Sequence, residues 1–133
     1  MQLFYPTHRA TLFVPRTGPK TDPDKAHLHI VLTDPCANKL NLVVPVCSRY
    51  AKCDQACLLG KGDHQFITRD SYVFYALADT YSAELLIKRV SVGDITYRGL
   101  IDEKIFAHVL NGLLKSNFTT PAVLAYYHKN KKP

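Results

Sequence analysis

The sequence lacks several features that would assign it to a common class of protein. It has no uninterrupted apolar run approaching the ~20 residues of a membrane-spanning helix, and its first residues do not form a basic segment followed by an apolar one. It also has no glycine-rich phosphate-binding loop, no His-Glu-x-x-His motif and no pair of carboxylates on one predicted helix. These absences argue against a membrane protein, a nucleotide hydrolase and a zinc protease, and we expect a cytoplasmic protein.

The composition predicts one globular domain over residues 1–133, because 47% of the residues are hydrophobic and 21% are charged. Lysine and arginine number 17 against 11 aspartates and glutamates, which gives a net charge of +6. A positive balance favours polyanionic partners without identifying one. Part of the excess lies in the tail 128–132, which is equally typical of a solvated helix end.

The four cysteines all lie between positions 36 and 57, which raises the question of a zinc site. Cys53 and Cys57 have the spacing of one ligand pair, with His64 as a conceivable third ligand, but Cys36 and Cys47 form no second pair of this kind. A cysteine in an apolar strand usually behaves as a small buried hydrophobe. We therefore predict no metal, no other cofactor and no disulfide, and keep Cys53, Cys57 and His64 as the alternative.

Short strands are predicted throughout the sequence before residue 100. Two ranges, 27–33 and 40–48, form a predicted hairpin around the short polar segment 36–39, and Pro45 is expected at an edge or a bulge because it has no N–H to donate. We expect five to seven strands in a mainly antiparallel sheet, arranged as a small barrel. The predicted strands are 11–14, 27–33, 40–48, 57–59, 72–77, 85–90 and 95–98, with a loop over 15–25 after the first.

Helical periodicity begins only after residue 100. Asp102 is a predicted N-cap, and the apolar residues that follow recur at steps of three and four, which predicts a helix over about 102–116 that packs across the sheet. Thr120 and Pro121 match a cap and a first-turn proline, which predicts a second helix over about 120–130.

The stretch 57–75 holds the densest mixture of turn formers, ionisable groups and aromatic strand residues. Gly60, Gly62 and Asp63 favour a turn, and His64 follows where the chain must straighten. A loop held by buried strands is a common place for binding and catalytic groups, although Gly-Asp-His is also an ordinary turn.

Metal-free acid and base chemistry is the reaction type that the remaining residues support. A histidine can move a proton and an arginine can hold a phosphate, which together suffice for cleavage of RNA by its own 2′-hydroxyl. We assign proton transfer to His27, phosphate stabilisation to Arg49 and hydrogen-bond donation to Ser48, because the hairpin makes these positions adjacent. Asp63 and His64 form either a second acid/base pair or a brace of the loop. His27 and His29 share one face of the predicted strand, and both could equally be partly buried strand residues with one satisfied hydrogen bond. We predict this structural role for His29.

The order of the segments resembles the MazF/PemK family of small ribonuclease toxins over about residues 11–116. The range 27–33 is similar to the family's Arg-Pro followed by an apolar strand that ends in Ser. The sequence Val-Pro-Val-Cys-Ser over 44–48 resembles its Pro-hydrophobic-Thr-Ser, and Asp-Ser-Tyr-Val over 70–73 resembles its Lys-Ser-hydrophobic-hydrophobic strand.

This resemblance implies an SH3-like antiparallel barrel with terminal helices, a homodimer, and a toxin of a toxin–antitoxin pair that cuts single-stranded RNA without a metal and is inhibited by an antitoxin protein. Two positions depart from the family pattern, because His27 stands at its catalytic arginine and Cys47 at its catalytic threonine. The opening Gly-Asp-hydrophobic-Trp motif is also absent. These departures support an alternative, a catalytically inactive barrel that binds a protein or a nucleic acid.

Overall fold

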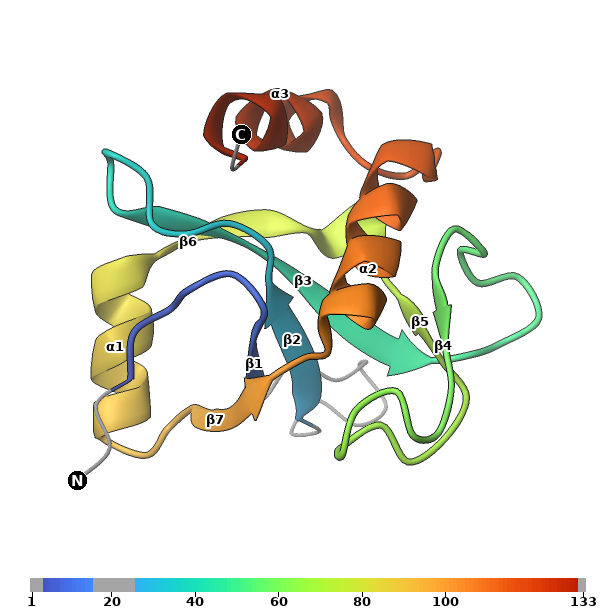
Figure 1. Ribbon diagram of the computed structural model, residues 1–133, viewed down its shortest axis with the longest axis horizontal. Helices are drawn as coiled ribbons and strands as arrows, with labels where there is room; N and C mark the ends of the chain where they lie inside the picture. The colour runs from blue at the N-terminus through green and yellow to red at the C-terminus, as the bar shows by residue number, and fades with distance from the viewer. Residues whose placement is uncertain (1–3, 16–25, 132–133) are drawn as a thin grey trace.

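The computed structural model describes residues 4–15 and 26–131 (Figure 1). Most of the loop predicted over 15–25 lies outside the described residues. The seven strands are β1 (Ala10–Val14), β2 (His27–Val31), β3 (Leu40–Ser48), β4 (Leu58–Leu59), β5 (Ser71–Val73), β6 (Asp79–Ser82) and β7 (Thr96–Leu100). The helices are α1 (Ala83–Ser91), α2 (Glu103–Lys115) and α3 (Pro121–Asn130), with one 3₁₀ turn, η1 (Tyr75–Leu77).

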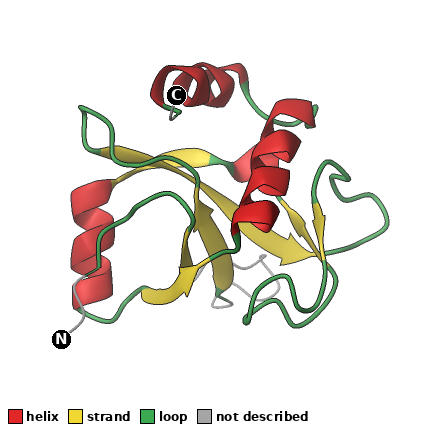
Figure 2. Ribbon diagram, in the orientation of Figure 1, coloured by secondary structure: helices red, strands yellow, loops and turns green. Residues whose placement is uncertain are grey.

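The strands form one antiparallel sheet in the order β4-β5-β3-β2-β1-β7, with β6 also paired to β3 (Figure 2). The long strand β3 pairs with β2 along one edge, and with β6 and then β5 along the other. The prediction of a mainly β protein with terminal helices is therefore confirmed. Within the described residues no pairing joins β4 to β7, so the sheet is open and the predicted barrel is not closed.

The predicted hairpin of β2 and β3 is confirmed, and its turn is closed by backbone hydrogen bonds between Cys36 and both Leu40 and Lys39. Pro45 lies inside β3 rather than at an edge of the sheet. The β6 pairing ends at Val43 and the β5 pairing begins at Val46, so Pro45 lies where β3 changes its partner. No ladder bond needs an N–H there, and the Pro45 carbonyl still accepts from the Phe74 N–H at 2.9 Å.

The strand predicted over 85–90 is wrong, because this segment belongs to α1. As a strand it would place Leu85, Ile87 and Arg89 on one face and Lys88 on the other, so neither face would suit a core. As a helix it gathers Ala83, Leu86 and Val90 on one side, and Ala83 and Leu86 are buried. The Ser82 hydroxyl caps the helix by accepting from the Leu85 N–H at 3.2 Å.

The strand predicted over 72–77 ends early, at Val73, and η1 follows. The reason is the packing of Tyr75, which is fully buried and donates its hydroxyl proton to the Val109 carbonyl in α2. Aromatic residues suit strands by propensity, but a buried tyrosine must also place its hydroxyl on an acceptor. This tertiary contact decides the local conformation.

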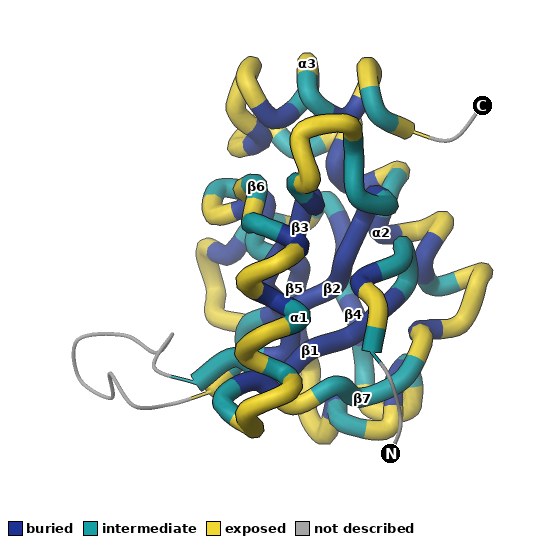
Figure 3. The backbone as a smooth tube through the Cα atoms, turned by 90° about the vertical axis from the view of Figure 1, so that its left-hand side faces the viewer, coloured by how far each residue is buried: buried dark blue, intermediate teal, exposed yellow. Residues whose placement is uncertain are grey.

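Both faces of the sheet carry an apolar core. Figure 3 shows how far each part of the backbone is buried, with much of β1, β2 and β3 buried. The larger core joins residues of β2, β3 and β5 to α2 and α3, through Phe106, Val109 and Leu113 of α2 and Val123 of α3. The smaller one joins β1, β2 and β3 to Leu86 of α1. Figure 1 shows α1 at the end of the sheet away from β4 and β5, so α1 does not cover that region. The two predicted C-terminal helices are confirmed, with Asp102 and Thr120 as their N-caps.

A substitution at Gly112 tests the close packing of α2 against Tyr75 and Cys57. A Cβ atom at this position would meet the Tyr75 hydroxyl and would lie 2.8 Å from the Cβ atom of Cys57. We expect Gly112→Ala to lower the free energy of unfolding, because overpacking costs about 1–3 kcal/mol and the gain in helix propensity is about 1 kcal/mol. Chemical denaturation measures the difference. Asn111→Ala, at the exposed neighbour, is the control and should not destabilise the protein.

Candidate functional site

Two cavities meet at the end of the sheet where β2 begins and β3 ends. The first has a volume of about 190 Å³ and is lined by Phe13, His27, Cys47, Ser48, Phe66, Arg69 and Ser71, among others. The second has a volume of about 340 Å³ and is lined by His27, His29, Pro45, Cys47, Leu77, Asp79 and Tyr81. We call them the serine-side and histidine-side cavities. His27 and Cys47 line both, so they lie where the two cavities join.

The register of the sheet explains this arrangement. His29 pairs with Pro45, so the same antiparallel register places His27 opposite Cys47. Opposite residues share a face, and the next residue along the strand, Ser48, belongs to the other face with its partner Ser71. The sequence correctly placed His27 and Ser48 at one end of the sheet. It did not predict that they alternate across the two faces of β3.

Arg69 supplies positive charge to the serine-side cavity. It is exposed and lies two residues before β5. The wall of the same cavity carries two aromatic rings, Phe13 and Phe66, whose centroids are 5.6 Å apart. The Arg98 guanidinium lies over both rings, 4.3 Å from the centroid of Phe66 and 5.3 Å from that of Phe13. Arg98 does not line the cavity itself, so Arg69 is the arginine that faces it.

Arg49 does not line either cavity. Its Nε atom donates to the Ser71 carbonyl and its Nη2 atom to the Leu59 carbonyl, each at 2.9 Å. Its Nη1 atom lies 3.9 Å from the Asp70 carboxylate. The guanidinium therefore joins the end of β3 to β4 and β5. This geometry favours a structural role over the predicted one of phosphate stabiliser.

Asp63 closes the turn that begins at Gly60. Its carboxylate accepts from the Gly60 N–H at 2.7 Å, and its own N–H donates to the Gly60 carbonyl at 3.0 Å. Gly62 adopts the left-handed backbone that this turn needs, with φ of 101°. The carboxylate therefore favours the predicted alternative of a loop brace.

His64 is buried, and both of its ring nitrogens have partners. Its Nδ1 atom accepts from the Phe66 N–H at 3.0 Å, and its Nε2 atom lies 3.0 Å from the Thr11 hydroxyl. That hydroxyl donates its only proton to the Gly99 carbonyl at 2.7 Å, so Nε2 carries a proton and donates to Thr11. Burial lowers the pKa of His64, and the neutral ring holds the 57–75 stretch against β1. This geometry also favours the loop brace.

His29 is a strand residue with one hydrogen bond, as predicted, but it is more deeply buried than expected. The residue is 3% exposed, and its Nδ1 atom lies 3.0 Å from the His27 carbonyl. Burial lowers its pKa to about 4, and the neighbouring His27 adds to this effect. His29 is therefore neutral at physiological pH and forms part of the floor of the histidine-side cavity.

The cysteines do not gather into a metal centre. Among the described residues, no group of three or more histidine, cysteine, aspartate or glutamate side chains could hold a metal ion. Cys53 and Cys57 are buried, and burial raises the pKa of the Cys57 thiol to about 11. His64, the third residue of the predicted alternative, uses both ring nitrogens in hydrogen bonds.

Sequence reasoning did not assign Arg69, Phe13 and Phe66 to the site. Phe66 lies inside the stretch 57–75, so its neighbourhood was identified, but a single aromatic residue in a loop carries no signal of what it faces. The position of Arg69 could have identified it, because it lies two residues before Ser71 of β5. Ser71 pairs with Ser48 of β3, so this end of β5 lies beside the predicted site.

No protein-family model matches the chain, and a search of curated proteins also gives no match. In the part of the chain that the structure describes, none of the helices is long and apolar enough to span a bilayer.

Proposed function

We propose that this protein binds single-stranded RNA across the joined cavities and cleaves it without a metal, as a MazF/PemK-like endoribonuclease. The observation that carries the proposal is the position of His27, which lines both cavities and shares the serine-side cavity with Ser48 and Arg69. In this proposal His27 transfers a proton, Arg69 stabilises the charge on the phosphate, and Ser48 donates a hydrogen bond to the RNA.

The aromatic rings in the wall of the serine-side cavity support RNA, rather than a compact anion, as the ligand. Nucleobases stack on aromatic rings, and such stacking contributes about 1–3 kcal/mol per base. Phe13 and Phe66 line the cavity and are both partly exposed, although the Arg98 guanidinium already lies over both rings. The net charge of +6 agrees in sign with a polyanionic ligand.

The resemblance supports three further parts of the proposal. The open sheet would be a variant of the family's SH3-like barrel, the active form would be a homodimer, and an antitoxin protein would inhibit it. A location of the protein in the cytoplasm would fit single-stranded RNA as its target.

A second candidate function is RNA or protein binding without catalysis. It is favoured by the contacts of Arg49 with two backbone carbonyls, because this is the arginine that the sequence predicted as the phosphate stabiliser. The two candidates share the cavity and differ in whether RNA is cut.

Arg69→Gln tests the proposed RNA site. We expect weaker binding of a fluorescently labelled single-stranded RNA, and a slope of log affinity against log salt that is shallower by about 0.7, the value for one lost phosphate contact. Fluorescence anisotropy at several salt concentrations measures both quantities. Lys104→Gln removes the same charge at an exposed position of α2 and should bind like the wild type. Equal slopes for Arg69→Gln and the wild type would remove Arg69 from the site.

A further inference from the structure

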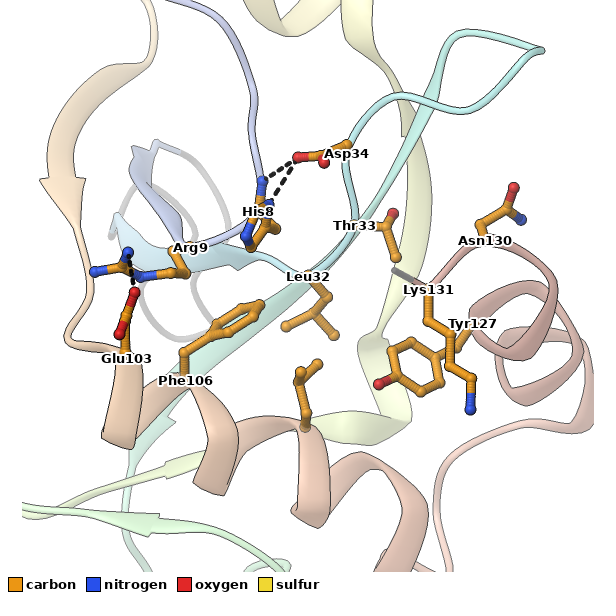
Figure 4. A pocket seen from close by; sticks show the side chains of 11 residues that line it. His8, Arg9, Leu32, Thr33, Asp34, Glu103, Phe106, Tyr127, Asn130 and Lys131 are labelled. Carbon is orange, nitrogen blue, oxygen red and sulfur yellow. Dashed lines mark hydrogen bonds and ion pairs between the residues drawn. The ribbon is translucent and has the colours of Figure 1, made fainter. Parts of the chain in front are cut away.

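A third cavity, which we call the helical cavity, lies between the segment before β1, the segment after β2, α2 and the end of α3 (Figure 4). Its volume is about 250 Å³, and it shares no lining residue with the serine-side or histidine-side cavity. An inference about this cavity is therefore independent of the proposed cleavage of RNA.

The inner walls of the helical cavity are apolar. Leu32 and Phe106 are buried, Leu110 is partly buried, and the Tyr127 ring closes the side formed by α3. The His8 ring packs against Phe106, with a distance of 5.8 Å between the centroids. These walls suit a hydrocarbon or a single aromatic ring, because ligand sites are lined mainly by apolar and aromatic side chains.

One polar atom inside the cavity has no protein partner. Tyr127 is 8% exposed, and none of the described residues forms a hydrogen bond with its hydroxyl. Figure 4 shows the hydroxyl end of the ring directed into the cavity, toward the side that carries Leu32 and Phe106. The residue is buried, but its hydroxyl is not among the buried polar atoms that lack a partner, so this oxygen reaches the open cavity and is available to a ligand.

The charges at the rim indicate the sign of the ligand. The Asp34 carboxylate lies 2.9 Å from the His8 Nδ1 atom, and the Glu103 carboxylate lies 3.4 Å from Arg9. Glu103 is thus paired with an arginine, and Asp34 with a histidine that is charged only when protonated. On the α3 side the charged lining residue is Lys131, with its ammonium group 6.0 Å from the centroid of the Tyr127 ring. An anionic group is therefore favoured at the α3 side of the cavity.

We propose that the helical cavity binds a small carboxylic acid with an apolar body. The apolar part lies between Phe106 and Leu32, and the carboxylate accepts from the Tyr127 hydroxyl and is attracted by the Lys131 ammonium. The cavity volume of about 250 Å³ lies below the range of roughly 300–1,000 Å³ typical of drug-sized ligands, so a molecule with one ring or a short chain fits.

Phenylacetate is a suitable probe, with the uncharged phenylacetamide as its matched comparison. In a titration of the full chain followed by amide NMR, phenylacetate should cause saturable shifts around Phe106 and Tyr127. Phenylacetamide should bind more weakly by about 3- to 10-fold, because it lacks the charge. Absence of saturable shifts around these residues, or equal binding of the two probes, would overturn the proposal.

Two variants test the assigned contacts. Tyr127→Phe removes only a hydroxyl that bonds to none of the described residues, and Lys131→Gln changes an exposed side chain, so both should keep the wild-type NMR spectrum outside the cavity. Each should weaken phenylacetate binding by about 3- to 10-fold. Lys129→Gln, an exposed residue of α3 that does not line the cavity, should bind like the wild type. If Tyr127→Phe and Lys131→Gln both bind as the wild type does, the carboxylate is not held as proposed.

Discussion

His27→Ala is expected to reduce cleavage of single-stranded RNA by about 10²–10⁴-fold, the usual contribution of a general acid or base. Its thermal unfolding should stay close to that of the wild type. His27 is only partly buried and begins β2, so truncation removes little core packing. A discontinuous cleavage assay in EDTA, combined with a thermal melt of the same sample, measures the two quantities together.

Two further variants separate catalysis from structure. Arg49→Ala removes two hydrogen bonds to backbone carbonyls, and His64→Ala removes the brace between β1 and the loop before β5. Each should lower the free energy of unfolding by about 1–3 kcal/mol. His108→Ala, an exposed position of α2, is the control for loss of an imidazole. Wild-type cutting by His27→Ala would exclude His27 as the proton-transfer residue.

Protonation of His29 should lower the free energy of unfolding in mild acid. Burial holds its pKa at about 4 in the folded state, below the ordinary value of 6.5, so the unfolded chain binds more protons between these two values. The contribution of His29 is fully present above pH 6.5 and is lost as the pH falls toward about 4. At 1.36 kcal/mol per unit of pKa, the loss is about 3 kcal/mol.

The measurement is the free energy of unfolding by urea between pH 7 and pH 4. His29→Gln should give a curve that is flatter by most of this amount, whatever its absolute stability. His108→Gln should keep the wild-type pH dependence, because that side chain is exposed. Parallel curves for His29→Gln and the wild type would show that His29 does not stay neutral in the fold.

The fold was predictable where local pattern and packing agree. Alternation and turn residues identified β2, β3 and their hairpin, and the caps Asp102 and Thr120 identified α2 and α3. The two errors of secondary structure have one cause. The segment 85–90 has residues that suit either a strand or a helix, and the segment 74–77 is aromatic, so in both places a tertiary contact made the choice.

The candidate site was predictable only as a region. The hairpin was sufficient to bring His27 and Ser48 to one end of the sheet. The hydrogen-bond partners of Arg49 and His64 could not be predicted in this way. Arg49 donates to the Leu59 and Ser71 carbonyls and His64 bonds to the Thr11 hydroxyl, and local sequence does not place these groups. A sequence shows which side chains can do chemistry, and only the fold shows which of them are already engaged.

Incubation of the pure wild-type protein with mixed single-stranded RNA in EDTA tests the central claim most directly. The proposal predicts cutting that leaves cyclic phosphate ends, as expected when the 2′-hydroxyl attacks and no metal is required. RNA that stays intact but is retained by the protein would support the binding module instead. RNA that is neither cut nor retained would contradict the assignment of the joined cavities to RNA.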